Sequence, residues 1–140
     1  MLAALLAVAC GADKVSKGAE VLVCGPSSAL AKGKATVSFR RDVLPFFSRY
    51  GCSSIDCHGG PFPQSSYDLT GYATLFGPGA QAARLKTCNV IPGNAQESYL
   101  IEKLEGRMAR GDRMPLGMEP MAAQELQLLR TWIDEGARDN

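Results

Sequence analysis

The sequence predicts an all-α domain with three to four helices and long loops. Apolar side chains recur at helical spacing in three separate segments, whereas no stretch of any length alternates polar and apolar residues as a β-strand does. The 140 residues include 15 glycines and 8 prolines, which favour turns and loops over long regular elements. We therefore expect short helices that pack together and loops that make up much of the remainder.

The first helix is expected over residues 43–51. The apolar side chains at helical spacing are Phe39, Val43, Phe46, Phe47 and Tyr50. Pro45 is tolerated only near a helix start, because proline lacks the N–H that a helix interior needs, and this places the start near residue 43. Residues 59–93 show little periodicity and are expected to form loops with one short helical turn near residues 72–76.

A second helix is expected over residues 95–105. Asn94 and Glu97 have the spacing of a capping pair at its start. The apolar stripe that follows consists of Leu100, Ile101 and Leu104. Gly106 stands where a helix commonly ends, so the helix should stop just before it.

The clearest helical pattern covers residues 122–135. Apolar residues at successive turns are Ala122, Leu126, Leu129 and Ile133, with Trp132 beside them. Gly136 again occupies the stop position. This helix is the firmest element of the prediction.

Composition and charge limit the classes of partner. With 46% hydrophobic and 21% charged residues, the chain has the balance of one globular domain. The formal net charge is +1, which provides no field able to hold nucleic acid or an anionic membrane. Neither is therefore expected as a partner.

The first ten residues resemble an export signal. Met1–Ala9 is an unbroken apolar run, too short to span a bilayer, and Cys10 follows it directly. The small residues before Cys10 resemble the lipobox of bacterial lipoproteins, in which the cysteine is lipidated. We expect a periplasmic or other extracytoplasmic location, with Cys10 as the candidate lipid anchor. The alternatives are a misplaced start codon and a frayed N-terminal helix.

The rest of the chain divides into two parts. Residues 11–37 are rich in Gly, Ala, Ser and Lys and are expected to form a tether or extension. Residues 38–138 carry all the expected helices and are predicted to be the folded domain.

One short segment carries the chemistry. Residues 51–60 (GCSSIDCHGG) contain the only histidine of the chain, His58, directly after Cys57. In c-type haem attachment, two thiols bond the porphyrin as thioethers, and the histidine next to the second thiol binds the iron. The usual motif has two residues between the cysteines and this one has four, so residues 53–56 would form a looped-out turn. We expect Cys52, Cys57 and His58 to hold one covalent haem c.

Two other interpretations of this segment stay open. A zinc site would need a fourth ligand from Cys24, Cys88 or a carboxylate, without the second closely spaced pair that structural zinc sites usually have. A local disulfide between Cys52 and Cys57, with an incidental histidine, is the other.

The iron would need a second axial ligand, and without another histidine a methionine is the expected one. Met114 is the preferred candidate because it precedes Pro115 in a loop, where the backbone can aim its sulfur. Met118 is the second candidate. Both could equally fill the core.

The cysteine count can also be accounted for. Five is odd for an exported protein, in which free thiols tend to oxidise. If Cys10 carries a lipid and Cys52 and Cys57 carry the cofactor, Cys24 and Cys88 remain. A disulfide between them would close a loop of roughly 60 residues and stabilise the fold by about 4 kcal/mol. The alternative is two separate buried thiols.

Taken in order, these motifs resemble the monohaem class I cytochrome c fold, specifically its planctomycete-type relatives and bacterial versions with a widened Cys-x4-Cys-His motif. The matching segments after the haem motif are Ile91-Pro92-Gly93-Asn94, Ser98-Tyr99-Leu100, Lys103-Leu104-Glu105-Gly106, Arg113-Met114-Pro115 and Trp132-Ile133-Asp134-Glu135-Gly136-Ala137. The resemblance covers residues 38–138.

The resemblance implies roles for particular residues. Cys52 and Cys57 would be the thioether attachments, His58 the proximal ligand and Met114 the distal ligand. The first and last helices would cross and pack through Phe46, Phe47, Leu129 and Trp132. Cys88 lies outside the family pattern, which is consistent with a disulfide.

An arginine cluster precedes the expected distal ligand. It consists of Arg107, Arg110 and Arg113. A guanidinium such as that of Arg113 could pair with a haem propionate. A solvated loop without such a role is an equal alternative.

These expectations lead to an electron carrier rather than an enzyme. An iron held by histidine and methionine in both oxidation states suits electron transfer. Its partners would be redox proteins, with a membrane respiratory or photosynthetic complex as the expected context. Two alternatives remain: a haem sensor or peroxidase-like protein with a labile sixth ligand, and a disulfide-stabilised exported binding module without haem.

Overall fold

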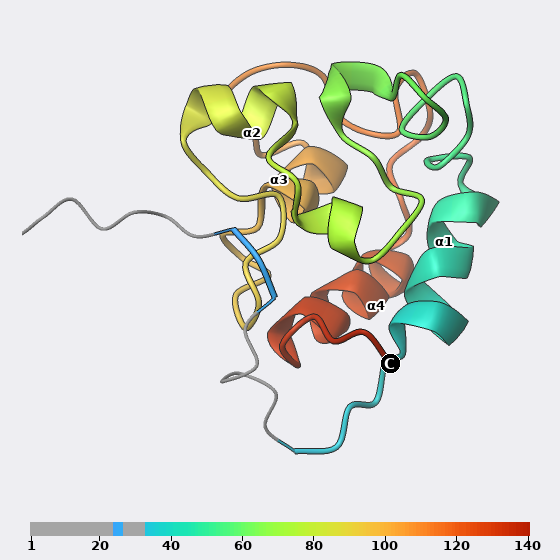
Figure 1. Ribbon diagram of the computed structural model, residues 1–140, viewed down its shortest axis with the longest axis vertical. Coiled ribbons are helices and arrows are strands. Elements are labelled where there is room, and N and C mark those ends of the chain that lie inside the picture. Colours follow the sequence, from blue (N-terminus) through green and yellow to red (C-terminus); the bar gives the residue numbers. More distant parts are fainter. Residues whose placement is uncertain (1–23, 27–32) are drawn as a thin grey trace, which may run out of the picture.

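The computed structural model describes residues 24–26 and 33–140. These residues form helices and loops with no β-strand (Figure 1), so the predicted all-α class is confirmed for the described part of the chain. In chain order the elements are a π-helix (Phe39–Val43), α1 (Leu44–Arg49), 3₁₀ helices at Gln64–Ser66 and Ala73–Phe76, α2 (Gly79–Leu85), α3 (Tyr99–Glu105) and α4 (Ala123–Asp134).

The expected helix over residues 43–51 is present as α1 (Leu44–Arg49), but the helical segment already begins before it, which the sequence did not predict. A π-helical turn begins at Phe39 and continues directly into α1. Ser38 caps it: its Oγ accepts the Arg41 N–H at 3.2 Å, while Asp42 Oδ2 accepts the Ser38 N–H at 2.8 Å. This reciprocal cap starts the helix at residue 39, and Pro45 still falls within the first turn of α1.

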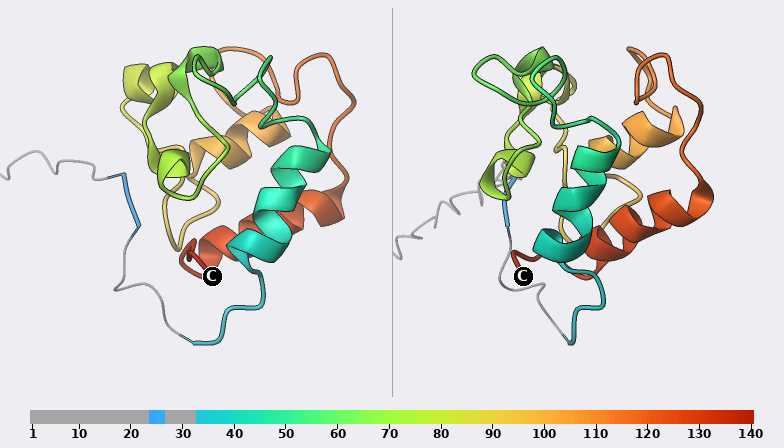
Figure 2. Two further views of the ribbon diagram at one scale, coloured as in Figure 1. Left: turned by 45° about the vertical axis from the view of Figure 1, so that its right-hand side comes forward. Right: turned by 90° about the vertical axis from the view of Figure 1, so that its right-hand side faces the viewer.

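Helix α4 agrees with the expected range of 122–135 to within one residue at each end. It packs against the segment that contains the π-helix and α1. The rings of Phe39 and Trp132 lie 5.7 Å apart, and Arg49 Nη1 lies 3.6 Å from Glu125 Oε1. Residue numbers rise in opposite directions along this contact, so the two segments run antiparallel where they cross (Figure 2).

Helix α3 is shorter than the expected 95–105. Asn94 and Glu97 do pair, with the Glu97 N–H donating to Asn94 Oδ1 at 3.1 Å, but they close a turn before the helix. Ser98 is the N-cap residue. Its Oγ donates to the Asn94 carbonyl at 2.8 Å and accepts the Ile91 N–H at 2.9 Å. Ser98 therefore ties the preceding turn together, and the helix starts only after it.

Helix α2 corrects the expectation that residues 59–93 hold only loops and one turn. The turn near residues 72–76 is present as the 3₁₀ helix Ala73–Phe76, but Gly79–Leu85 is helical as well. Within α2 only Gly79 and Ala82 are buried, so it has no apolar stripe for periodicity to detect. Its run of Ala, Gln, Arg and Leu has high intrinsic helix propensity, and this propensity is the feature of the sequence that could have predicted the helix.

Helices α3 and α4 are joined by a charged contact at Glu105. Its carboxylate accepts hydrogen bonds from Arg107 and from Arg130 of α4. Burial acts to raise the pKa of Glu105, but the hydrogen bonds from the two guanidinium groups outweigh it and hold that pKa below its usual value.

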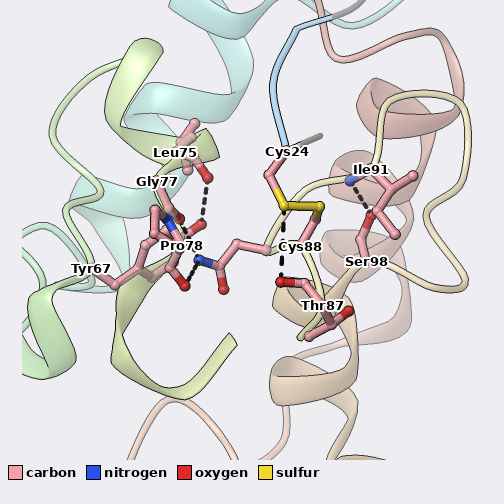
Figure 3. Close-up of a disulfide and its surroundings, with 10 residues drawn as sticks. Cys24, Tyr67, Leu75, Gly77, Pro78, Thr87, Cys88, Ile91 and Ser98 are labelled. Carbon is pink, nitrogen blue, oxygen red and sulfur yellow. Dashed lines mark hydrogen bonds between the residues drawn. A yellow bond between two sulfur atoms is a disulfide. The ribbon is translucent and has the colours of Figure 1, made fainter. Parts of the chain in front are cut away.

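The described residues of the N-terminal extension contact the domain at several positions, among them Thr36 and Cys24. The Thr36 hydroxyl donates to Glu135 Oε1 at 2.6 Å, just after α4. Cys24 forms a disulfide with Cys88, with 5.3 Å between their Cα atoms (Figure 3). This is one of the two arrangements that the cysteine count left open. Residues 1–23, including Cys10 and the signal-like run, lie outside the described residues.

One apolar core lies between the helices. Its largest fully buried members are Phe46, Phe47, Leu75, Ile101, Leu129, Trp132 and Ile133. The four side chains through which the first and last helices were expected to pack all belong to this cluster. Within the described part of the chain, no helix is long and apolar enough to cross a membrane.

Candidate cofactor-binding site

The loop after α1 brings His58 back to Cys52 despite the wide cysteine spacing. The Cys52 N–H donates to the Phe47 carbonyl at 2.8 Å, which fixes the first cysteine at the end of the helix. The His58 N–H donates to the Cys52 carbonyl at 2.9 Å, and the Cys57 N–H to the Ser54 carbonyl at 3.1 Å. The two additional residues are therefore absorbed in a closed turn.

Gly59 makes this closed turn possible. It is buried, and a Cβ built on it would lie 2.2 Å from the Ser53 carbonyl oxygen and 3.0 Å from that of Ser54. Any side chain here would collide with backbone, which cannot rotate away. Glycine lets the turn lie directly against the residue that follows His58.

The imidazole of His58 is oriented by backbone carbonyls. Its Nδ1 lies 3.1 Å from the Gln64 carbonyl oxygen and 3.0 Å from the Tyr67 carbonyl oxygen. Carbonyl oxygens only accept, so Nδ1 carries the proton in both contacts. In the neutral ring, Nε2 then keeps its lone pair for a metal or an acceptor role. The same arrangement orients most metal-binding histidines.

A cavity of about 500 Å³ lies beside this loop. Cys52, Cys57, His58 and Met114 all line it, as does Met118. In the right-hand view of Figure 2, the green segment after α1 and the orange segment between α3 and α4 lie at the left and the right of the upper part of the molecule. The cavity thus brings together residues that are more than fifty positions apart in the sequence.

Most of the other lining residues are apolar or aromatic. They include Phe47, Tyr50, Tyr67, Leu69, Ala82, Leu100, Leu104, Pro115 and Leu116. The volume falls in the range of roughly 300–1,000 Å³ typical of small-molecule and cofactor sites. The cavity therefore suits a large, mostly apolar ligand.

Cys52 and Cys57 are both free thiols, so the local disulfide considered from the sequence is not formed. Burial, and secondarily the nearby Cys57, raises the pKa of the Cys52 thiol to about 11. That thiol is protonated at neutral pH and is a weak nucleophile on its own. Among the described residues, no three His, Cys, Asp or Glu side chains are grouped as a metal site would require.

Met114 is held in place more firmly than Met118. Its N–H donates to the Lys103 carbonyl of α3 at 2.9 Å, and its side chain packs partly buried against the core cluster. Met118 lines the same cavity but is 51% exposed. The geometry therefore favours Met114 of the two sulfur candidates.

Arg113 lies beside the cavity lining rather than within it. Its Nη2 donates to the Met118 carbonyl, and its aliphatic chain covers Gly106. Arg113 thus closes the loop that carries Met114. Arg107 binds Glu105 instead, and Arg110 is exposed.

Helix α3 contributes two polar lining residues that the sequence did not single out as site residues, Tyr99 and Lys103. Their separation of four positions places them on one helix face. This spacing could have identified the two residues as one polar face of the helix. The neighbouring apolar stripe was instead interpreted as evidence for core packing alone.

Comparison of the chain with protein-family models, with curated proteins and with solved structures returned no match.

Proposed function

We propose that this chain is a class I c-type cytochrome that carries single electrons on one covalently bound haem c. The observation that supports this most strongly is that Cys52, Cys57, His58 and Met114 line one largely apolar cavity of about 500 Å³. The sequence alone suggested these four residues, and their convergence on one cavity is what the function would require.

Three properties of the site fit haem c. Both thiols are free, as thioether formation requires. His58 Nδ1 is engaged by carbonyls, which leaves Nε2 for the iron. The Met114 thioether, which also lines the cavity, would offer the iron a soft sulfur ligand of the kind that raises the reduction potential of electron-transfer cytochromes. Haem, when bound, supplies an iron that alternates between the ferric and ferrous states.

The protein residues would keep the ligands fixed and water out. The Gln64 and Tyr67 carbonyls hold the His58 ring in one orientation, and the Lys103 carbonyl anchors the backbone of Met114. The apolar lining residues would limit the access of water to a group that fills the space between them. Ligands that stay in place through a change of oxidation state suit an electron carrier rather than an enzyme with an open coordination position.

The proposed location is extracytoplasmic, with redox proteins, including a membrane respiratory or photosynthetic complex, as partners. The disulfide between Cys24 and Cys88 supports this location, because structural disulfides persist mainly in oxidising compartments. The signal-like run and a lipid anchor at Cys10 remain predictions from the sequence.

The proposal is tested by producing the protein in a host with c-type maturation machinery. Spectra of the oxidised and reduced forms, followed by acid-acetone extraction, should reveal a sharp reduced α band and haem that stays with the protein. The sulfur-to-iron charge-transfer band should be lost in Met114→Ala and kept in Met108→Ala, whose side chain does not line the cavity.

Three results would contradict parts of the proposal. A folded protein without covalent haem would favour the disulfide-stabilised binding module. Loss of the sulfur band in Met118→Ala instead of Met114→Ala would move the sixth ligand. Rapid carbon monoxide binding by the reduced wild-type protein would favour a sensor or peroxidase-like protein with a labile ligand.

A further inference from the structure

The backbone of Tyr67 determines how the His58 ring is held. The Tyr67 carbonyl oxygen lies 3.0 Å from His58 Nδ1, in a partly buried contact. The other acceptor of this ring, the Gln64 carbonyl, lies in an exposed contact at 3.1 Å. That carbonyl also accepts the Tyr67 N–H at 3.2 Å, so its position depends on Tyr67 as well. Both acceptors of the imidazole proton are therefore set by the placement of Tyr67.

The side chain of Tyr67 is anchored at both of its ends. Tyr67 is 8% exposed, and its hydroxyl donates to the Leu75 carbonyl at 3.0 Å (Figure 3). At the other end, a Cβ built on Gly79 would lie only 2.9 Å from Tyr67 Cβ. Gly79 has a φ of +53°, which glycine adopts at no steric cost, so it permits this close approach. Tyr67 is thus fixed between Leu75 and Gly79.

The segment that receives the Tyr67 side chain is itself held in place by Asn89. The Asn89 side chain is buried, and its Nδ2 donates to the Gly77 carbonyl at 2.6 Å and to the Pro78 carbonyl at 3.0 Å (Figure 3 draws these bonds). These two bonds account for both hydrogens of the amide nitrogen. Residues 75–79 therefore form a fixed frame for the tyrosine ring.

We infer that Tyr67 is a positioning residue for the proposed iron ligand His58: the bond from its hydroxyl to the Leu75 carbonyl holds its own carbonyl against His58 Nδ1. This inference rests on the proposed function, because it concerns the histidine that would bind the iron. A carbonyl acceptor on Nδ1 makes the imidazole a stronger electron donor, and a stronger donor favours the ferric state. Tyr67 thereby keeps the reduction potential below the value that a loosely held histidine would give.

The experiment compares haem-loaded Tyr67→Phe with Tyr72→Phe. Each change removes one hydroxyl that donates to a backbone carbonyl, but Tyr72 donates to Ala137 and does not line the cavity. Both variants should therefore lose similar stability. At a fixed applied potential, the ratio of ferrous to ferric protein should rise in Tyr67→Phe by up to about tenfold, which corresponds to about 59 mV for one electron. In Tyr72→Phe the ratio should stay at the wild-type value.

A second measurement reports the hydrogen bond itself. His58 is the only histidine of the chain, so NMR spectra of the ferrous protein should contain one imidazole Nδ1–H signal. In Tyr67→Phe this proton should exchange with solvent faster than in the wild type, whereas in Tyr72→Phe its exchange rate should be unchanged. A purely structural role of the Tyr67 hydroxyl would lower stability without changing the potential or this exchange rate.

Different outcomes separate this inference from the proposed function. Haem-loaded Tyr67→Phe with the ratio and the exchange rate of Tyr72→Phe would overturn the inference alone. A raised ratio without faster exchange would overturn it too, because the effect would then not pass through His58 Nδ1. If Tyr67→Phe yields no haem protein, Gly79→Ala decides by the same two changes or their absence, because its Cβ would press on Tyr67 Cβ. Wild-type protein without haem would overturn the proposed function, and the inference with it.

Discussion

The sharpest structural prediction concerns Gly59→Ala. The added Cβ would lie 2.2 Å from the Ser53 carbonyl oxygen, more than 1 Å short of ordinary contact, and the obstacle is backbone. Gly59 does not have a positive φ, so its backbone angles allow alanine and the cost is steric. The turn over residues 53–56 must move away, which strains the bond from the His58 N–H to the Cys52 carbonyl. Overpacking of this kind costs about 2–3 kcal/mol.

The assay is urea unfolding of the haem-loaded protein, followed by fluorescence of the single tryptophan, Trp132, which is 1% exposed. We expect a free energy of unfolding lower by about 2–3 kcal/mol and a smaller fraction of chains with covalent haem. Gly71→Ala is the matched control, because its Cβ would lie 3.6 Å from Thr74 Oγ1, an ordinary contact. That variant should stay within about 0.5 kcal/mol of the wild type.

One result would refute the reasoning. If Gly59→Ala has the stability of Gly71→Ala and full haem attachment, the turn does not lie against residue 59. The hydrogen bond from the His58 N–H to the Cys52 carbonyl would then need another explanation.

Three further predictions concern stability. Reduction of the disulfide between Cys24 and Cys88 should lower the free energy of unfolding by about 4 kcal/mol in the chain-entropy model. A reductant should have no such effect on a variant with serine at both positions. An equal effect on that variant would mean that other thiols are responsible. Leu129 is fully buried in α4, so Leu129→Ala should lower the free energy of unfolding in urea by about 2–5 kcal/mol. The control Gln127→Ala, at an exposed position of the same helix, should lower it by less than about 0.5 kcal/mol. Similar losses for the two variants would contradict the described core. The pKa of Glu105 is lowered in the folded state, so the carboxylate stabilises the fold above its ordinary pKa near 4.5, and this contribution is lost as the pH falls through the folded pKa. In thermal melts, Glu105→Gln should therefore reduce the loss of stability that the wild type shows on acidification. An unchanged loss would contradict the contact of Glu105 with its two arginine partners.

Local sequence signals were sufficient where a single segment determines its own structure. The apolar spacing around Leu129 and Trp132 predicted α4 to within one residue at each end, because a helix that buries one face must repeat its apolar residues every three or four positions. The same rule failed for α2, which buries only Gly79 and Ala82 and so has no stripe. The capping pair of Asn94 and Glu97 misplaced the start of α3, because it closes a turn before the helix and Ser98 directs its hydroxyl back into that turn.

The sequence by itself determined which residues could do the chemistry: the only histidine stands beside a cysteine, and a methionine precedes a proline. Only the tertiary structure decided that Cys52, His58 and Met114 line one cavity, since residues this far apart meet through packing rather than local preference. It also decided that the buried hydroxyl of Tyr99 has no hydrogen-bond partner among the described residues. Burial and hydrogen-bond satisfaction depend on the whole fold, and no local pattern encodes them.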